Sequence, residues 1–227
     1  ASLAAMPGLR VVLITPRFWP LFGGPEDVVA TLAVGLQRRG VEPTVLTACW
    51  DPHWSPQMAY RHIPVVRLAH PGTRSWGTLR YLIALARWLR RHRGHIDLLY
   101  VAGLGHEASV ARRVLGARSI PIVVRPDLPD DREGRPPSRW LLRRRCQSAA
   151  AAIVADPAAA RAVSAAGVPE ERIHRIADCL RESVVEHACD RSEARLALAD
   201  VNAMLTVADD APVVVCVGRL RKGRRLP

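Results

Sequence analysis

The chain has 227 residues, 49% of them hydrophobic and 24% charged, which suffices for one large globular domain or one domain with part of another. Its five cysteines form no C-x-x-C pair, which argues against a disulfide framework and a zinc site, and no apolar run is long enough to span a bilayer. The net charge of +12 comes almost wholly from arginine, with a single lysine, and no recognised nucleic-acid module accompanies it. We therefore expect no nucleic-acid partner. The N-terminal residues lack a signal-peptide pattern, which favours a cytoplasmic location.

The N-terminal part has the pattern of a strand, a loop ending in two glycines, a helix and a second strand, expected over 11–15, 16–24, 25–40 and 44–47. Pro25 suits the first helical position, and Glu26 suits the positive end of the helix dipole. Gly23 and Gly24 would let a ligand approach the free N–H groups at the helix start, which predicts a site for a phosphate or a sugar hydroxyl. The alternative is a plain turn in a parallel sheet. Neither G-x-G-x-x-G nor a P-loop lysine is present.

Strands and helices alternate along the rest of the chain. Further strands are expected over 63–68, 96–101, 119–125, 150–156 and 171–178, helices over 78–91, 107–115, 138–148, 157–167 and 192–207, and irregular structure over 48–62. This alternation predicts an α/β fold, a doubly wound, Rossmann-like parallel sheet with helices on both faces. Ligands of such sheets bind at the carboxyl ends of the strands, where the loops 16–24, 102–106 and 126–131 should meet.

The C-terminal part suggests a second domain. A fresh apolar strand is expected over 212–220, after about thirty residues without one, and a lone strand cannot bury itself. We therefore expect one Rossmann-like domain over 9–190, followed over 191–227 by a linker helix and the first strand of a second domain that the chain does not contain.

Four segments, in this order, resemble the N-terminal, acceptor-side half of a GT-B glycosyltransferase of the retaining family 4 type. They are the GG-x-E of Gly23, Gly24 and Glu26, the run RRGVEPTVLT, the run GVPEERIHRIAD, and VVVCVGRLRKG, which is similar to the family's opening of the donor-side domain. Each motif is loose, but the order is specific, and the likeness covers essentially the whole chain.

The resemblance implies transfer of a sugar, as in hexosyltransferases, from a nucleotide-diphosphate sugar to a carbohydrate or lipid-linked acceptor, with no metal and no cofactor. Backbone N–H groups and basic side chains would steady the leaving diphosphate. Gly23, Gly24 and Glu26 would face the donor, and Arg219 and Lys222 would hold the diphosphate from the other domain. Because transfer needs both domains, the chain by itself should be inactive or nearly so.

The chain departs from the family pattern near the reacting sugar. Where family members often carry a His after the fifth strand, this chain has Arg125, Pro126 and Asp127, and Asp178 stands at the start of the family's N-G-V-D. The catalytic candidates are therefore Asp127 and His106, which lies in the neighbouring loop. The alternative for His106 is a helix-start residue with no chemistry.

Two further interpretations stay open. The domain could be a non-catalytic nucleotide-binding Rossmann-like module, although the one acidic candidate for a ribose contact, Asp51, comes late. Residues 75–93 are basic and amphipathic, with Trp76 and Trp88, and predict peripheral contact with an anionic membrane surface. The alternative is an ordinary helix packed on the sheet with its arginines in water.

Overall fold

The structure of the protein is a computed structural model. The residues that the structure describes are 8–21, 23–70, 75–103, 105–116, 120–126, 140, 143, 146, 149–178, 189–208 and 210–213. The chain divides into two compact units, Ala1–Arg181 and Glu182–Pro227.

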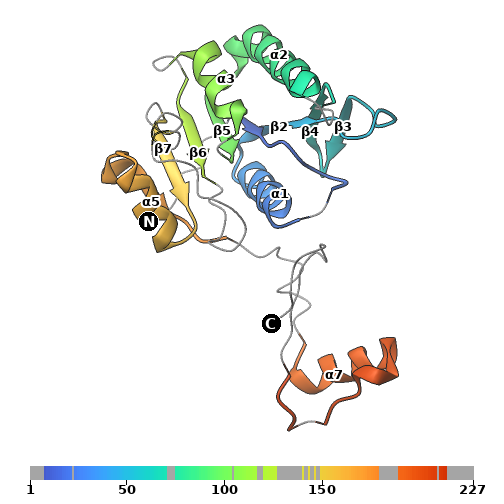
Figure 1. Cartoon of the computed structure of the whole chain (residues 1–227). Helices are drawn as coiled ribbons and strands as arrows, with labels where there is room; N and C mark the ends of the chain where they lie inside the picture. The colour runs from blue at the N-terminus through green and yellow to red at the C-terminus, as the bar shows by residue number, and fades with distance from the viewer. Residues whose placement is uncertain are drawn as a thin grey trace. The chain divides into compact units, whose positions relative to one another are not determined.

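The first unit is built on one sheet, which has eight strands within the described residues, in the order β3-β4-β2-β1-β5-β6-β7-β8 (Figure 1). The strands are β1 Arg10–Ile14, β2 Glu42–Ala48, β3 Gln57–Tyr60, β4 Ile63–Leu68, β5 Leu98–Ala102, β6 Ile122–Arg125, β7 Ala151–Val154 and β8 Ile173–Arg175. All neighbours are parallel except β3 and β4. The predicted doubly wound α/β fold is therefore confirmed.

The prediction of irregular structure over 48–62 is wrong at β3. This strand pairs antiparallel with β4 through a tight turn at Arg61 and His62, whose φ angles are +49° and +67°. Both residues lie in the left-handed region that hairpin turns usually fill with Asn or Gly. Because that turn signal is missing and the strand is short, the sequence pattern did not reveal the hairpin.

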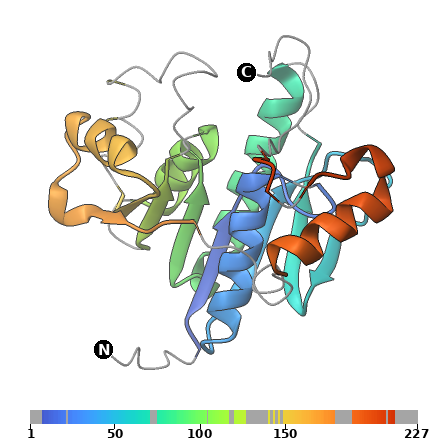
Figure 2. The ribbon, with the colours of Figure 1, turned by 90° about the horizontal axis from the view of Figure 1, so that it is seen from below.

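Helices cover both faces of the sheet. They are α1 Gly24–Gln37, α2 Ser75–His92, α3 His106–Leu115 and α5 Pro157–Ala165. Helix α1 lies along one face, and α2 and α3 lie side by side on the opposite face (Figures 1 and 2). Two hydrophobic clusters result, one between α1 and the sheet around Leu13 and Phe18, and one beneath α2, α3 and α5 around Ile14, Leu85 and Leu99. Adjacent residues of β1, Leu13 and Ile14, thus serve opposite faces, as the alternation of side chains along a strand requires.

The amino-terminal edge of the sheet is held by an ion pair between β1 and the start of β5. The Arg10 guanidinium donates to both carboxylate oxygens of Asp97, at 2.7 and 2.9 Å, and the Arg10 backbone N–H donates to the same carboxylate. These bonds favour the ionised carboxylate, and they lower the pKa of Asp97 from 3.8 to about 2.

The second unit contains helix α7, Arg191–Val201, which begins where the Asp190 carboxylate accepts a hydrogen bond from the Glu193 backbone N–H. Leu196 and Val201 of this helix are exposed. The strand expected over 212–220 lies almost wholly outside the described residues. No helix in the described part of the chain has the length and apolar character needed to cross a membrane.

Candidate functional site

A pocket of about 160 Å³ lies at the carboxyl edge of the sheet, where the sequence pattern predicted ligand binding. Helix α1, the end of β5, the end of β6 and the segment after β8 form it, and its lining residues are Gly24, Pro25, Val28, Val29, Ala102, Arg125 and Asp178. Because β1, β5 and β6 are parallel neighbours, their carboxyl ends and the helix that follows β1 must come together here. The predicted loops 16–24 and 102–106 therefore meet at the pocket, through Gly24 and Ala102, and the predicted loop 126–131 begins directly after Arg125.

The glycines at the start of α1 are not needed by the chain itself. Gly23 has a φ of 171°, an extended conformation that any residue adopts. A Cβ added to Gly24 would meet no atom within 4 Å. No side chain caps the helix at Gly23, whose carbonyl accepts the first helical hydrogen bond from Asp27 N–H at 3.0 Å. The missing side chains therefore leave the positive end of α1 open to a ligand, which is the arrangement that favours anions and hydroxyl oxygens.

Glu26 turns away from the pocket and toward the loop that follows β1. Its carboxyl group is buried, and Oε1 lies 3.0 Å from Nε of Arg17 without the alignment of a hydrogen bond. The Arg17 guanidinium also lies 5.9 Å from the ring centre of Trp50, whose indole N–H donates to the Pro16 carbonyl at 2.8 Å. Glu26 thus holds the glycine loop in place, and direct contact between Glu26 and a donor stays a prediction.

An ion pair forms one wall of the pocket. The guanidinium of Arg125, at the end of β6, donates to Oδ1 of Asp178, which follows β8. The Arg125 side chain is 13% exposed and the Asp178 side chain 50%. Burial opposes the charge of Arg125, but the bond to Asp178 and the proximity of Tyr100 outweigh it, so the pKa of Arg125 is raised. The pocket therefore holds a permanently charged arginine whose partner carboxylate remains in contact with water.

Of the other predicted site residues, only His106 lies within the described part of the chain. His106 is the exposed first residue of α3 and does not line the pocket, so its catalytic role stays a prediction. Asp127, Arg219 and Lys222 lie outside the described residues. Within the described ranges, no group of three or more His, Cys, Asp or Glu side chains is arranged to hold a metal ion.

The pair of Arg125 and Asp178 is the feature of the site that sequence reasoning missed. Both residues were recognised as departures from a family pattern, but they are 53 positions apart in the chain. Each follows or ends a strand, which signals the carboxyl edge of the sheet. Their contact depends on the strand order β6-β7-β8 and on the turn after β8, which no local pattern encodes.

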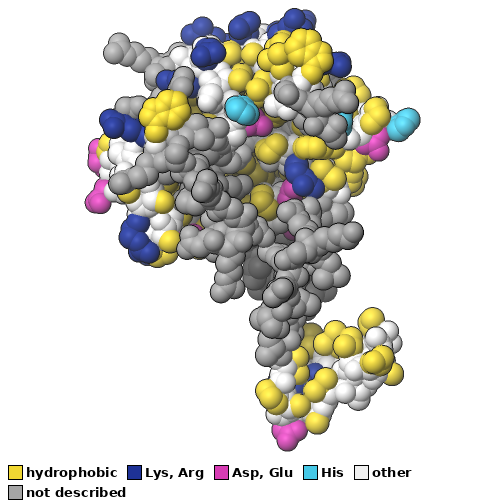
Figure 3. All heavy atoms as spheres, in the orientation of Figure 1, with side chains coloured by type: hydrophobic (Ala, Val, Ile, Leu, Met, Phe, Trp, Pro, Cys, Tyr) yellow, Lys and Arg dark blue, Asp and Glu magenta, His cyan; other side chains and the backbone are white. Residues whose placement is uncertain are grey.

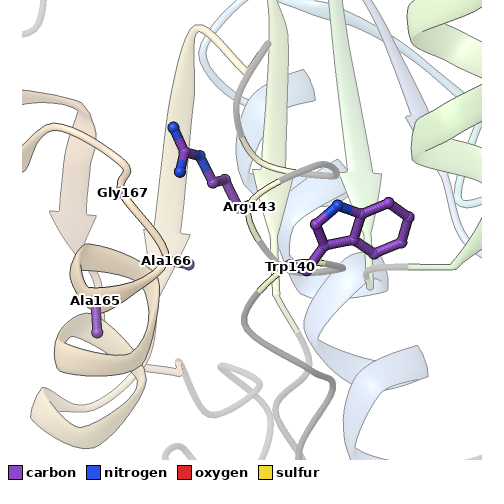
Figure 4. A pocket seen from close by; sticks show the side chains of 5 residues that line it. All are labelled: Trp140, Arg143, Ala165, Ala166 and Gly167. Carbon is purple, nitrogen blue, oxygen red and sulfur yellow. The ribbon is translucent and has the colours of Figure 1, made fainter.

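A second, larger pocket of about 350 Å³ lies elsewhere in the first unit, lined by Trp140, Arg143, Ala165, Ala166 and Gly167. Trp140 and Arg143 project in different directions (Figure 4), and Arg143 Nε lies 3.8 Å from where a Cβ added to Gly167 would stand. Gly167 precedes the amino end of β8, whereas ligands of parallel sheets bind at the carboxyl ends. The smaller pocket is therefore the stronger candidate.

Comparison with known proteins identifies the family of the chain. The family model for Glycosyltransferase Family 4 matches residues 22–179, more than half of the chain. The chain belongs to Glycosyltransferase Family 4. The residues that line the two pockets all lie inside the matched range. Among curated proteins, no sequence matches the chain.

Solved structures with a similar fold are GT-B glycosyltransferases. Sucrose-phosphate synthase from Thermosynechococcus elongatus superposes with a TM-score of 0.64 and 14% identity, over 84% of this chain and 52% of the synthase. HepE from Anabaena, in complex with UDP and glucose, gives 0.59 and 18%, over 86% and 50%. The catalytic domain of Arabidopsis thaliana starch synthase IV, bound to ADP and acarbose, gives 0.57 and 16%, over 81% and 54%. The family 4 chain thus spans about half the length of these proteins and has the fold of one GT-B half.

Proposed function

We propose that this chain is the acceptor-side domain of a retaining GT-B glycosyltransferase, which transfers a hexosyl group from a nucleotide-diphosphate sugar to a carbohydrate or lipid-linked acceptor. The observation that carries the proposal is the coincidence of the family 4 match with the pocket at the carboxyl edge. The complexes of HepE with UDP-glucose and of starch synthase IV with ADP support a nucleotide-sugar donor.

In this proposal the start of α1 and Arg125 supply the positive potential. Negative charge develops on the leaving diphosphate during transfer, and oriented N–H groups with a buried arginine stabilise it without reorganisation. Gly24 lets the sugar or phosphate reach the helix end, and no step requires a metal. Asp127 and His106 remain the candidates for a side chain beside the reacting sugar.

The second domain would complete the binding site for the donor, through Arg219 and Lys222. Rate enhancement in such an enzyme depends on holding donor and acceptor together in one closed site. The 227-residue chain is accordingly expected to show little or no transfer by itself.

The test is calorimetric titration of the chain with UDP-, GDP- and ADP-sugars, before and after a matched C-terminal half is added. Binding and transfer that appear only with the second half support the proposal. Tight binding of one nucleotide by the chain alone would instead favour the non-catalytic nucleotide-binding module. Gly24→Val, which fills the open helix end, should weaken binding roughly tenfold or more in either case, and Gly35→Ala on the same helix serves as the control.

A further inference from the structure

Helix α2 presents an apolar strip to water. Tyr81, Leu85 and Leu89 point into the core, as expected for a helix packed on a sheet. On the opposite side of the helix, Trp76 is 72% exposed, Leu79 44% and Ile83 41%. These positions are spaced by three and four residues, so the three side chains adjoin on one face of the first turns. The apolar strip is therefore additional to the buried face and contributes nothing to the core.

The same outward face is strongly basic. Arg80, Arg87, Arg90 and Arg91 are exposed, and α2 contains no acidic residue. The adjoining helix α3 adds Arg112 and Arg113, which are exposed as well. Figure 3 shows Lys and Arg side chains along the top of the molecule, over α2 and α3, with hydrophobic side chains among them.

The acidic groups near this surface do not neutralise it. Glu107 at the start of α3 is half-buried and close enough to the buried Tyr81 to raise the pKa of that phenol, after the larger effect of burial. Asp97, beyond the end of α2, is bound to Arg10. Among the described residues, the outward face of α2 therefore carries a net positive charge.

We propose that the outward face of α2 docks on an anionic lipid bilayer. Trp76, Leu79 and Ile83 would enter the interface between headgroups and acyl chains, and the arginines of the following turns would contact lipid phosphates. Charge complementarity selects this occupant over a second copy of the chain, because two such faces would oppose arginine to arginine with no carboxylate between them.

The docking surface and the candidate pocket share one edge of the sheet. Helix α2 follows β4, so its first turns, which carry Trp76 and Leu79, lie toward the carboxyl edge of the sheet, where the pocket is. A lipid-linked acceptor would then pass around this edge from the membrane to the pocket, which lies on the α1 side of the sheet. This last step rests on the proposed transfer reaction, whereas the docking itself does not.

Co-sedimentation of the full chain with vesicles tests the proposal. Phosphatidylcholine vesicles are compared with vesicles containing phosphatidylglycerol, at about 0.1 M and about 0.5 M salt. We expect binding to the anionic vesicles and a clear loss at the higher salt. The triple variant Arg87→Gln, Arg90→Gln, Arg91→Gln should bind about fivefold more weakly per arginine, or roughly a hundredfold in all. The variant Trp76→Ala, Leu79→Ala, Ile83→Ala should bind at least roughly tenfold more weakly.

A matched control keeps the test specific. Arg161, Arg172 and Arg175 are exposed on other elements, and their triple change to Gln lowers the net charge by the same amount. Equal weakening by the control would mean that net charge alone drives binding, and would overturn the proposal. So would undiminished binding of either α2 variant, or vesicle-independent dimerisation that the apolar variant abolishes.

Depth of insertion gives a second readout that does not depend on activity. Lipids brominated on the acyl chain should quench part of the tryptophan fluorescence of the bound protein, and Trp76→Phe should remove that part while vesicle binding persists. Quenching that survives in Trp76→Phe would refute insertion at this face. Because none of these assays contains a sugar donor, failure of the proposed transferase would leave their outcome unchanged.

Discussion

Replacing Asp178 by Asn tests the ion pair in the wall of the pocket. The change keeps the size of the side chain but removes the charge that Arg125 contacts. Breaking a fully buried ion pair costs about 3–5 kcal/mol, and an exposed pair contributes about 0–1 kcal/mol. Here the arginine is 13% exposed and the aspartate 50%, so water already screens one partner. We therefore expect a loss of about 1–2 kcal/mol in the free energy of unfolding.

The same change should strengthen anion binding. A carboxylate about 8 Å from a bound phosphate, at an effective dielectric constant of about 40, repels it by about 1 kcal/mol. Asp178→Asn should therefore raise the affinity for a nucleoside diphosphate about fivefold, measured by titration calorimetry with the second domain added. Arg125→Met should lower that affinity, because it removes the buried cation that Asp178→Asn leaves in place.

A double-mutant cycle separates the pair from the surrounding contacts. Unfolding in urea, followed by tryptophan fluorescence, gives the free energies of the chain, the two single variants Asp178→Asn and Arg125→Met, and the double variant. We expect a coupling energy of about 1–2 kcal/mol. A coupling energy near zero would refute the ion pair as a contributor to stability, and weaker anion binding by Asp178→Asn would refute the repulsion argument.

Three further predictions concern the glycine loop, the core and the amino-terminal edge. Gly24→Val should leave the thermal midpoint of unfolding nearly unchanged, because a Cβ added at this position meets no atom within 4 Å. The same variant should lower the affinity for a nucleotide sugar by roughly tenfold or more in calorimetry. An unchanged affinity would place the ligand elsewhere. Leu85→Ala, at a fully buried position, should lower the free energy of unfolding in urea by about 3–5 kcal/mol. Ile83→Ala, on the outer face of the same helix, should lower it by less than about 1 kcal/mol. Similar losses for the two variants would contradict the assignment of the buried and outer faces. The bond to Arg10 lowers the pKa of Asp97 from 3.8 to about 2, so the pair stabilises the fold fully above the ordinary pKa of Asp97 and loses this effect as the pH falls toward 2. Asp97→Asn should therefore remove that part of the pH dependence of the thermal midpoint of unfolding. An unchanged fall of the midpoint in acid would argue against the pair.

Much of the fold was predictable because it follows from short-range patterns. Runs of β-branched residues separated by helical periods lead to strands and helices in alternation, and that alternation forces a parallel sheet covered on both faces. Pro25 and the two preceding glycines likewise marked the start of α1 and, with it, an open helix end. Hairpin β3–β4 escaped prediction because its turn uses Arg61 and His62 in a conformation usually adopted by Gly or Asn.

The details of the site depended on contacts between distant segments. Glu26 has the sequence features of a ligand at a helix start, and only the structure reveals that its buried carboxylate lies against Arg17. The strand order brings Arg125 and Asp178 together across the carboxyl edge, and the packing of α2 on the sheet decides that Trp76 faces water although its residue type is equally common in cores. The sequence by itself thus determined the elements and the edge of the sheet where ligands bind, because backbone periodicity is local. Only the tertiary structure decided which charges face one another and which apolar groups stay exposed, because burial and pairing are properties of segments far apart in the chain.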